Sequence, residues 1–305
     1  MKIVSYLRGI PRHNKNIQKT QILHEFIAGV NKVNDTGLVH DEETIVPADV
    51  AIMQGWVYKD LSTPHLRFRK KIIDFQKDNG KRLIIADASC FRFADETNRF
   101  NYLKYSFDGI FPTTGNYCDT YINRDRWTSI KYNLNLDILP YKNSGKDILI
   151  LAQRTGGWSM KNLNILDWLI ATITKIKEHS DRKIIIRPHP GDRKAKIYIS
   201  QLNNLLLPNV KVSVNRSLDE DLTKTWAIVN HNSSAAVGPI IKGYHCFLTN
   251  HIDSHNKEVS HSDFKYLEQP LYFDRQSWLE RISMFHWNFE ELRNGVCWQH
   301  MKKFV

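Results

Sequence analysis

The sequence has few cysteines and no long apolar run. Four of its 305 residues are cysteines, and no two of them form a Cys-x-x-Cys pair. This spacing argues against a zinc ribbon or a disulfide scaffold and favours reduced thiols in a cytoplasm-like compartment. No window approaches the roughly 18 apolar residues that a membrane span needs, and the first residues lack a signal-peptide pattern. We therefore expect a soluble, cytoplasmic protein with no membrane span.

Acidic residues are the minority among the charged ones. The chain has 43 Lys and Arg against 32 Asp and Glu, which gives a net charge of +11. This excess favours a polyanionic partner: nucleic acid, an anionic membrane surface or a phosphorylated small molecule. A basic surface that merely keeps the protein soluble is the alternative. The basic residues are scattered, with the densest points at 67–71, 181–183 and 192–196, as on a folded surface.

The chain lacks internal repeats and alternates short apolar stretches with stretches of helical periodicity. We predict strands at 2–7, 49–56, 82–87, 107–112, 148–153, 183–188, 210–214, 226–230 and 245–250. We predict helices at 16–33, 66–78, 162–178, 197–206, 217–225 and 233–243, with Ser217 as an N-terminal cap. The polar segment 139–147 fits a linker between two halves.

Strands that alternate with helices indicate parallel βαβ units with right-handed crossovers. The sequence therefore predicts an α/β protein with two Rossmann-like domains that face a cleft. One domain is expected at 1–140, and the other, including the C-terminal helices, at 141–305. In open parallel sheets ligands bind at the carboxyl ends of the strands, so candidate functional residues are those that directly follow strands.

Three loops that follow predicted strands in the second half carry residues suited to a phosphate. They hold Arg154, Thr155, Gly156 and Gly157 after the first strand, Arg187 and His189 after the second, and Asn232, Ser233 and Ser234 after the fourth. Glycines let a backbone approach an anion, arginine offers bidentate contacts, and serines at a helix start add donors beside a favourable dipole. Two prolines restrict the backbone around His189 and thereby fix its imidazole as a donor.

Each of these features has a plainer explanation when it is taken alone. Two serines before an apolar helix are more often only a cap, and a Gly-Gly pair occurs in many turns. A single histidine after a strand is more often structural than catalytic. The conjunction of three loops at one predicted edge of a sheet favours a ligand site.

The segments RPHPG (187–191) and VNHNSSAAVGPIIKG (229–243) resemble the His-Pro and Ser-Ser motifs of GT-B glycosyltransferases. The likeness is to capsule-polysaccharide and sialyltransferase-like enzymes that use nucleotide sugars. It implies that His189, Ser233 and Ser234 hold the donor phosphate and that His189 takes part in catalysis. The tail resembles that of capsule-type transferases at Trp287, Glu290, Glu291, Leu292, Gly295 and Trp298. This chain departs from the pattern at 235–239, where no glutamate is present to hold a ribose.

The first half must then supply the acceptor site and, for an inverting reaction, a general base. We favour Asp87, at the end of a predicted strand, as that base. Asp35 and Asp119 are alternatives, although Asp35 fits a turn better.

The loop that follows the first predicted strand is basic. Its residues Arg8, His13 and Lys15 are expected to contact the acceptor or the donor phosphates. No metal-ligand cluster stands out, and cationic side chains can take the place of a metal ion. We therefore expect no metal and no cofactor besides the nucleotide sugar, with a UDP-sugar favoured.

The segments LRGIPRHNKN, ADVAIMQGW and LKYSFDGIFPTTGNY resemble segments of tailed-phage proteins, some of them glycosyltransferases acting on hydroxymethylated DNA. This resemblance and the positive charge favour transfer to the hydroxymethyl group of 5-hydroxymethylcytosine in double-stranded DNA, in the host cytoplasm if a phage encodes the chain. That group projects into the major groove, where an enzyme can reach it. Two alternatives stay open: a capsule- or lipopolysaccharide-type glycosyltransferase with a carbohydrate acceptor, and a non-catalytic protein that binds nucleic acid or a nucleotide.

Overall fold

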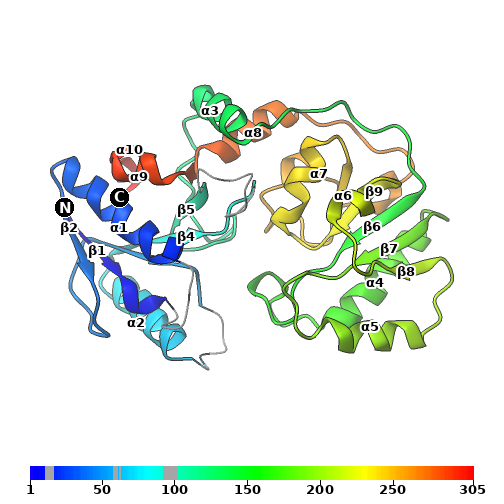
Figure 1. The fold of residues 1–305 in the computed structure, drawn as a ribbon, viewed down its shortest axis with the longest axis horizontal. Helices are drawn as coiled ribbons and strands as arrows, with labels where there is room; N and C mark the ends of the chain where they lie inside the picture. Colours follow the sequence, from blue (N-terminus) through cyan, green and yellow to red (C-terminus); the bar gives the residue numbers. More distant parts are fainter. Residues whose placement is uncertain (11–16, 58–60, 62, 92–101) are drawn as a thin grey trace. The chain divides into compact units, whose positions relative to one another are not determined.

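The computed structural model describes residues 1–10, 17–57, 61, 63–91 and 102–305. The chain forms two compact units (Figure 1). One comprises Met1–Asn135 together with Glu280–Val305, and the other comprises Leu136–Leu279. Each unit has its own sheet and its own hydrophobic core, so each is described by itself.

The first unit is built on a six-stranded sheet in the order β11-β5-β4-β3-β1-β2. The parallel strands are β1 (Lys2–Tyr6), β2 (Thr36–His40), β3 (Val50–Gln54) and β4 (Arg82–Asp87). Strand β5 (Leu103–Phe107) runs antiparallel to both β4 and β11 (His286–Trp287). The helices of this unit are α1 (Ile17–Lys32), α2 (Pro64–Asp78), α3 (Arg124–Leu134), α9 (Phe289–Arg293) and α10 (Val296–Met301), with 3₁₀ turns η1 (Leu7–Gly9) and η7 (Lys302–Phe304).

Helix α1 shows how the sequence builds the core of this unit. Ile22, Phe26 and Val30 recur every fourth residue and therefore share one face of the helix. Each is at most 1% exposed, and all three belong to one cluster with Ile3 of β1. The apolar face of α1 thus packs on the parallel strands, as the periodicity predicts.

The first sheet departs from the expected strands in three places. A strand was expected at 107–112, but β5 ends at Phe107 and the chain turns at Asp108, which has a φ of 63°. The Asp108 carboxylate accepts from the Leu83 amide at 2.8 Å and so fixes this turn. Strands β2 and β11 were not expected. The residues of β2 are mostly half-buried or exposed, so its apolar pattern is weak, and β11 is only two residues long.

The second unit has a five-stranded, all-parallel sheet in the order β10-β9-β6-β7-β8. Its strands are β6 (Asp147–Leu151), β7 (Lys183–Arg187), β8 (Val210–Val212), β9 (Thr225–Asn230) and β10 (His245–Leu248). Its helices are α4 (Ile165–Lys177), α5 (Ala195–Asn204), α6 (Leu218–Leu222), α7 (Val237–Ile241) and most of α8 (Arg275–Ser283), with 3₁₀ turns η3 (Trp158–Met160), η4 (Ser234–Ala236), η5 (Lys257–Val259) and η6 (Phe264–Tyr266). Ser217 caps α6 as predicted, because its side chain accepts from the Glu220 amide.

The strand order of the second sheet reverses at β6. From β6 the chain continues to β7 and β8 on one side, and then returns to β9 and β10 on the other. The carboxyl end of the sheet between β6 and β9 is therefore its topological switch point, where ligands of such sheets bind. Every residue of β9 is buried, as expected of a central strand covered on both faces.

The C-terminal segment packs on the first unit, whereas the sequence had assigned it to a domain at 141–305. Its partners lie far away along the chain: Arg293 forms an ion pair with Glu25, and the Trp298 indole donates to Asp35 at 2.8 Å. Helices α1 and α9 approach so closely that a Cβ added to Gly29 would lie 1.9 Å from the Leu292 carbonyl oxygen. The tail motif that resembles capsule-type transferases thus has a packing role in this chain.

Candidate functional site

Three adjacent strands of the second sheet end at the same level. Leu151, the last residue of β6, is in register with Arg187 on β7 and with Asn230 on β9. The loops that follow these strands therefore start side by side at the carboxyl edge of the sheet. The structure brings together in this way the three loops that the sequence singled out.

His189 lies in the loop after β7 and is exposed. The Gly191 amide donates to its Nδ1 at 3.0 Å, so the neutral ring carries its proton on Nε2. Partial burial and the nearby charge of Arg154 lower the pKa of the imidazole. At neutral pH this ring is thus a fixed neutral donor through Nε2.

Arg154 is exposed in the neighbouring loop after β6. Within the described part of the chain its guanidinium forms no ion pair with a carboxylate. An exposed arginine beside a histidine donor, with no internal counter-ion, suits an anionic ligand.

Thr155 joins the first two loops. Its amide and its hydroxyl donate to the same oxygen of Asp192, at 2.8 and 2.7 Å. Burial opposes ionisation of Asp192, but the hydrogen bonds from Thr155 and from the Lys194 amide, with the charge of His189, together outweigh it, so the pKa of this carboxyl is lowered. Both donors that the sequence offered to a phosphate at Thr155 are therefore engaged inside the protein. Asp192 was not among the predicted site residues.

The two glycines after Thr155 form a turn. Gly156 has a φ of 68°, which glycine adopts without strain, and the Gly157 amide donates to the Arg154 carbonyl at 3.0 Å. The Gly157 amide is thus used to close the turn that presents Arg154.

Arg187 has a structural partner. Its guanidinium donates to Asp221 and to the Arg216 carbonyl, both at 2.7 Å. The Asp221 side chain is fully buried and also accepts from the Ser213 hydroxyl. The guanidinium that the sequence suggested for a phosphate therefore neutralises a buried carboxylate on α6.

The serine pair begins the 3₁₀ turn η4. The Ser233 hydroxyl accepts from the Ala235 amide at 3.1 Å, and the Ser233 amide donates to Asn230 at 2.8 Å. The hydroxyl proton of Ser233 stays available, and the half-buried Ser234 hydroxyl has no hydrogen bond within the described residues. Ser233 thus caps the turn, as expected of a serine at this position, and it also presents a fixed hydroxyl group at this edge of the sheet.

A buried amide pair lies at the switch point itself. Gln153, two residues after the end of β6, donates through Nε2 to the Asn232 side-chain oxygen at 2.8 Å. The two residues are 5% and 9% exposed, yet Gln153 Oε1 and Asn232 Nδ2 have no hydrogen-bond partner among the described residues. Buried polar atoms are rarely left unsatisfied, so this pair points to a polar ligand. Gln153 was missed because the sequence placed it inside the expected strand 148–153, whereas β6 ends at Leu151.

His231 precedes this pair and has a structural role. Its Nδ1 lies 2.8 Å from the Thr249 hydroxyl, which also accepts from the Trp168 indole. Burial and the charge of Lys161 lower the pKa of His231 to about 4, so the ring is neutral at physiological pH.

Asp87, the candidate base, ends β4 in the first unit. Its Oδ2 lies 3.1 Å from the ammonium of Lys104, a side chain that is 11% exposed. Burial alone would lower the pKa of Lys104, but the charge of Asp87 raises it above its ordinary value. Oδ1 of Asp87 has no hydrogen bond or ion pair among the residues that the structure describes.

The other candidate acids of the first unit are in ion pairs. Asp35 accepts from the amino group of Met1, from Trp298 and from Lys302, and these contacts lower its pKa against the effect of burial. Asp119 pairs with Arg281 at 2.8 Å. Both carboxylates therefore hold the C-terminal segment in place.

Arg8, from the basic loop after β1, contacts Asp41 through its Nε at 3.1 Å. His13 and Lys15 lie outside the described residues. Among the described residues, no group of three or more His, Cys, Asp or Glu is placed to hold a metal ion. No helix in this part of the chain is long and apolar enough to cross a bilayer.

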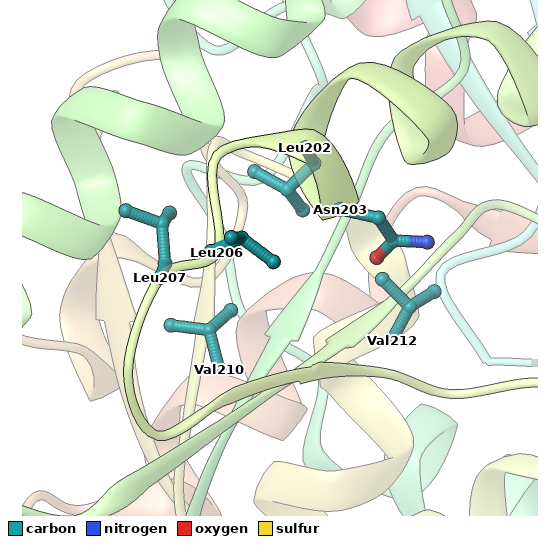
Figure 2. A pocket seen from close by; sticks show the side chains of 6 residues that line it. All are labelled: Leu202, Asn203, Leu206, Leu207, Val210 and Val212. Atoms are coloured by element: carbon teal, nitrogen blue, oxygen red, sulfur yellow. The ribbon is translucent and has the colours of Figure 1, made fainter.

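A hollow of about 280 Å³ lies beside the edge strand β8 (Figure 2). It is lined by Leu202, Asn203, Leu206, Leu207, Val210 and Val212. This lining carries no charge and includes no residue of the three loops. The hollow is thus separate from the candidate site.

Neither a family model nor a curated protein matches the chain. Similar solved structures include two from Thermosulfurimonas dismutans, described as KpsC, beta Kdo 2,4 transferase and KpsC, beta Kdo 2,7 transferase. The first has a TM-score of 0.53 and 13% identity, and the match covers 97% of this chain and 98% of that one. The second has a TM-score of 0.54 and 11% identity, with 98% and 99% covered. This likeness and the two sheets confirm the predicted fold class, an α/β chain with two Rossmann-like units of the GT-B type.

Proposed function

We propose that the chain is a glycosyltransferase that moves a sugar from a nucleotide-sugar donor to a hydroxyl group. The observation that carries this proposal is the set of donors at the carboxyl edge of the second sheet. Arg154, the Nε2–H of His189 and the two serine hydroxyls come from three loops whose strands end in register. Such a set can stabilise the negative charge that develops on a departing nucleoside phosphate.

The reaction follows directly from these roles. The acceptor oxygen attacks the anomeric carbon while a base removes its proton, and the bond from that carbon to the phosphate oxygen breaks. Asp87 stays our candidate for the base, through Oδ1. The phosphate leaves with the bonding electron pair, and Arg154 and His189 stabilise its negative charge. The amide pair Gln153–Asn232 supplies one acceptor and one donor, both without a partner among the described residues, for a polar edge of the nucleotide.

We favour a carbohydrate hydroxyl as the acceptor. Two structures of the same fold are described as Kdo transferases, which supports transfer among sugars. The second candidate is the hydroxymethyl group of 5-hydroxymethylcytosine in double-stranded DNA, and the observation in its favour is the net charge of +11. A UDP-sugar is our first choice of donor.

Calorimetry of the protein against a panel of UDP-, CMP- and GDP-sugars tests the proposal. One member of the panel should bind, and in its presence an acceptor should be glycosylated. Oligosaccharides, plain duplex DNA and hydroxymethylated duplex DNA, tested as acceptors, separate the two candidates. Binding of DNA or of a nucleotide with no transfer to any acceptor would identify a non-catalytic binding protein and refute the proposal.

A further inference from the structure

Arg69 is a buried cation at the carboxyl edge of the first sheet. It lies on α2, is 5% exposed, and donates to the Gly9 carbonyl at 2.6 Å and to the Trp56 carbonyl at 3.0 Å. Gly9 follows β1 and Trp56 follows β3, two neighbouring strands from which the chain moves off in opposite directions. Arg69 therefore spans the switch point of this sheet, the position where a ligand is expected.

The backbone around Arg69 is fitted to the guanidinium. Gly55 has a φ of 78°, and a Cβ added there would lie 2.9 Å from the terminal Nη1 of Arg69. Both hydrogen bonds of Arg69 end on neutral carbonyls, so they orient the charge without cancelling it. Burial lowers the pKa of Arg69 to about 10, which still leaves it fully charged at neutral pH.

Lys19 and His65 are half-buried side chains at the same carboxyl edge of the sheet. Lys19 is in the first turn of α1, the helix that follows β1, and His65 is in the first turn of α2, the helix that follows β3. Burial and the charge of Arg69 lower the pKa of Lys19, and burial and both of these charges lower the pKa of His65. Lys19, His65 and Arg69 thus form a cluster in which the charges of Lys19 and Arg69 disfavour protonation of His65, so its ring is neutral at neutral pH.

No carboxylate neutralises this cluster by contact. Within the described residues, none of the three side chains forms an ion pair with Asp or Glu, and Asp87 acts on Arg69 only at longer range. Like charges that gather in a partly buried place disfavour their own charged forms, and a bound anion relieves that cost. Lys19 and His65 are half-buried and stay accessible to such an anion, while the buried Arg69 adds a fixed charge at the same edge.

We propose that Lys19 and His65, supported by Arg69, form a subsite for an anionic group of the acceptor, a carboxylate or a phosphate. The assignment of this anion to the acceptor rests on the proposed function, whereas the anion site itself does not. An acidic carbohydrate would offer carboxylates, and a nucleic acid or a phosphorylated sugar would offer phosphates. Both sources offer a negatively charged oxygen group, and the probes in the following test distinguish between them.

The test is a titration of the full chain, labelled with carbon-13 in its histidine rings, without any nucleotide sugar. The probes are inorganic phosphate, glucuronate and neutral glucose, and the His65 signal is assigned with the His65→Gln variant. The His65 signal should move with phosphate or glucuronate and stay still with glucose. Lys19→Gln should weaken this binding about tenfold or more, because a charge-assisted contact is lost. Lys71→Gln, an exposed change of the same charge on α2, should leave it unaltered.

Stronger binding of phosphate assigns the subsite to a phosphate, and stronger binding of glucuronate assigns it to a carboxylate. A His65 signal that moves with neither anion, or an equal response in the Lys19→Gln variant, overturns the proposal. Because no donor is present, a positive result combined with absent sugar transfer would refute the proposed function and leave the anion site standing.

Discussion

Thr155 and Asp192 tie two of the three site loops together, since both the amide and the hydroxyl of Thr155 donate to one oxygen of Asp192. This contact joins the loop that presents Arg154 to the loop that presents His189. It uses a short polar residue in each loop and leaves the longer side chains free. The site loops are therefore held in place by residues that do not themselves face a ligand.

Asp192→Asn should destabilise the folded protein by about 1–3 kcal/mol at neutral pH, because it weakens hydrogen bonds to a charged acceptor. The pKa of Asp192 is lowered in the folded state, so its contribution is full above the ordinary value of about 4 and is lost as the pH falls below it. Urea unfolding of wild type and variant across this pH range checks the prediction. The exposed Asp181→Asn change is the control, and an equal effect of both at neutral pH would contradict the role of Asp192.

His189→Ala should lower the affinity for the nucleotide sugar about tenfold or more, because one donor to the phosphate is lost. The lowered pKa of His189 means that the neutral ring is the donor at pH 7, so binding should not weaken as the pH rises from 7 to 8. Calorimetry with the tightest-binding member of the nucleotide-sugar panel measures both effects. His179→Ala removes an exposed histidine at the end of α4 and serves as the control. Unchanged binding in His189→Ala would remove this residue from the site.

The sequence predicted those parts of the site that depend on local pattern. Three consecutive isoleucines before Arg187 indicate a buried strand, and the chain then has to place His189 at the carboxyl edge. The serines at 233–234 follow in the same way from the apolar strand β9. These positions were predictable because burial and strand direction are set by nearby residues.

The partners of the polar side chains were not predictable, since they are distant in sequence. Asp221, which engages Arg187, is 34 residues away, and its approach depends on how α6 packs. Glu25 and Arg293 are 268 residues apart, so no local pattern could predict that the C-terminal segment packs on the first unit. Whether an arginine serves a ligand or a buried carboxylate is decided by such long-range contacts.

Gly295→Ala should destabilise the first unit by more than about 1 kcal/mol. Gly295 has a φ of 77°, and an added Cβ would lie 2.6 Å from the Val33 side chain and 2.7 Å from the Gly29 carbonyl oxygen. Gly80→Ala is the matched control, because Gly80 also has a positive φ, of 62°, but meets no atom within 4 Å. Hydrogen exchange should show lost protection within 1–135 and 280–305 and unchanged protection within 136–279. Lost protection centred on the second unit would contradict the assignment of the tail.

Substitution of Arg187 and of Arg154 should show that Arg187 is structural and that Arg154 binds the ligand. Arg187→Gln leaves the buried Asp221 carboxylate without its shortest ion pair, and the free energy of unfolding should fall by about 3 kcal/mol. Arg154→Gln removes an exposed side chain with no ion pair among the described residues, so stability should change by less than about 0.5 kcal/mol. Affinity for the nucleotide sugar should show the opposite order, with a loss of about tenfold in Arg154→Gln. Urea unfolding and calorimetry on the same two variants decide the matter, and a stability loss in Arg154→Gln as large as in Arg187→Gln would refute the division of roles.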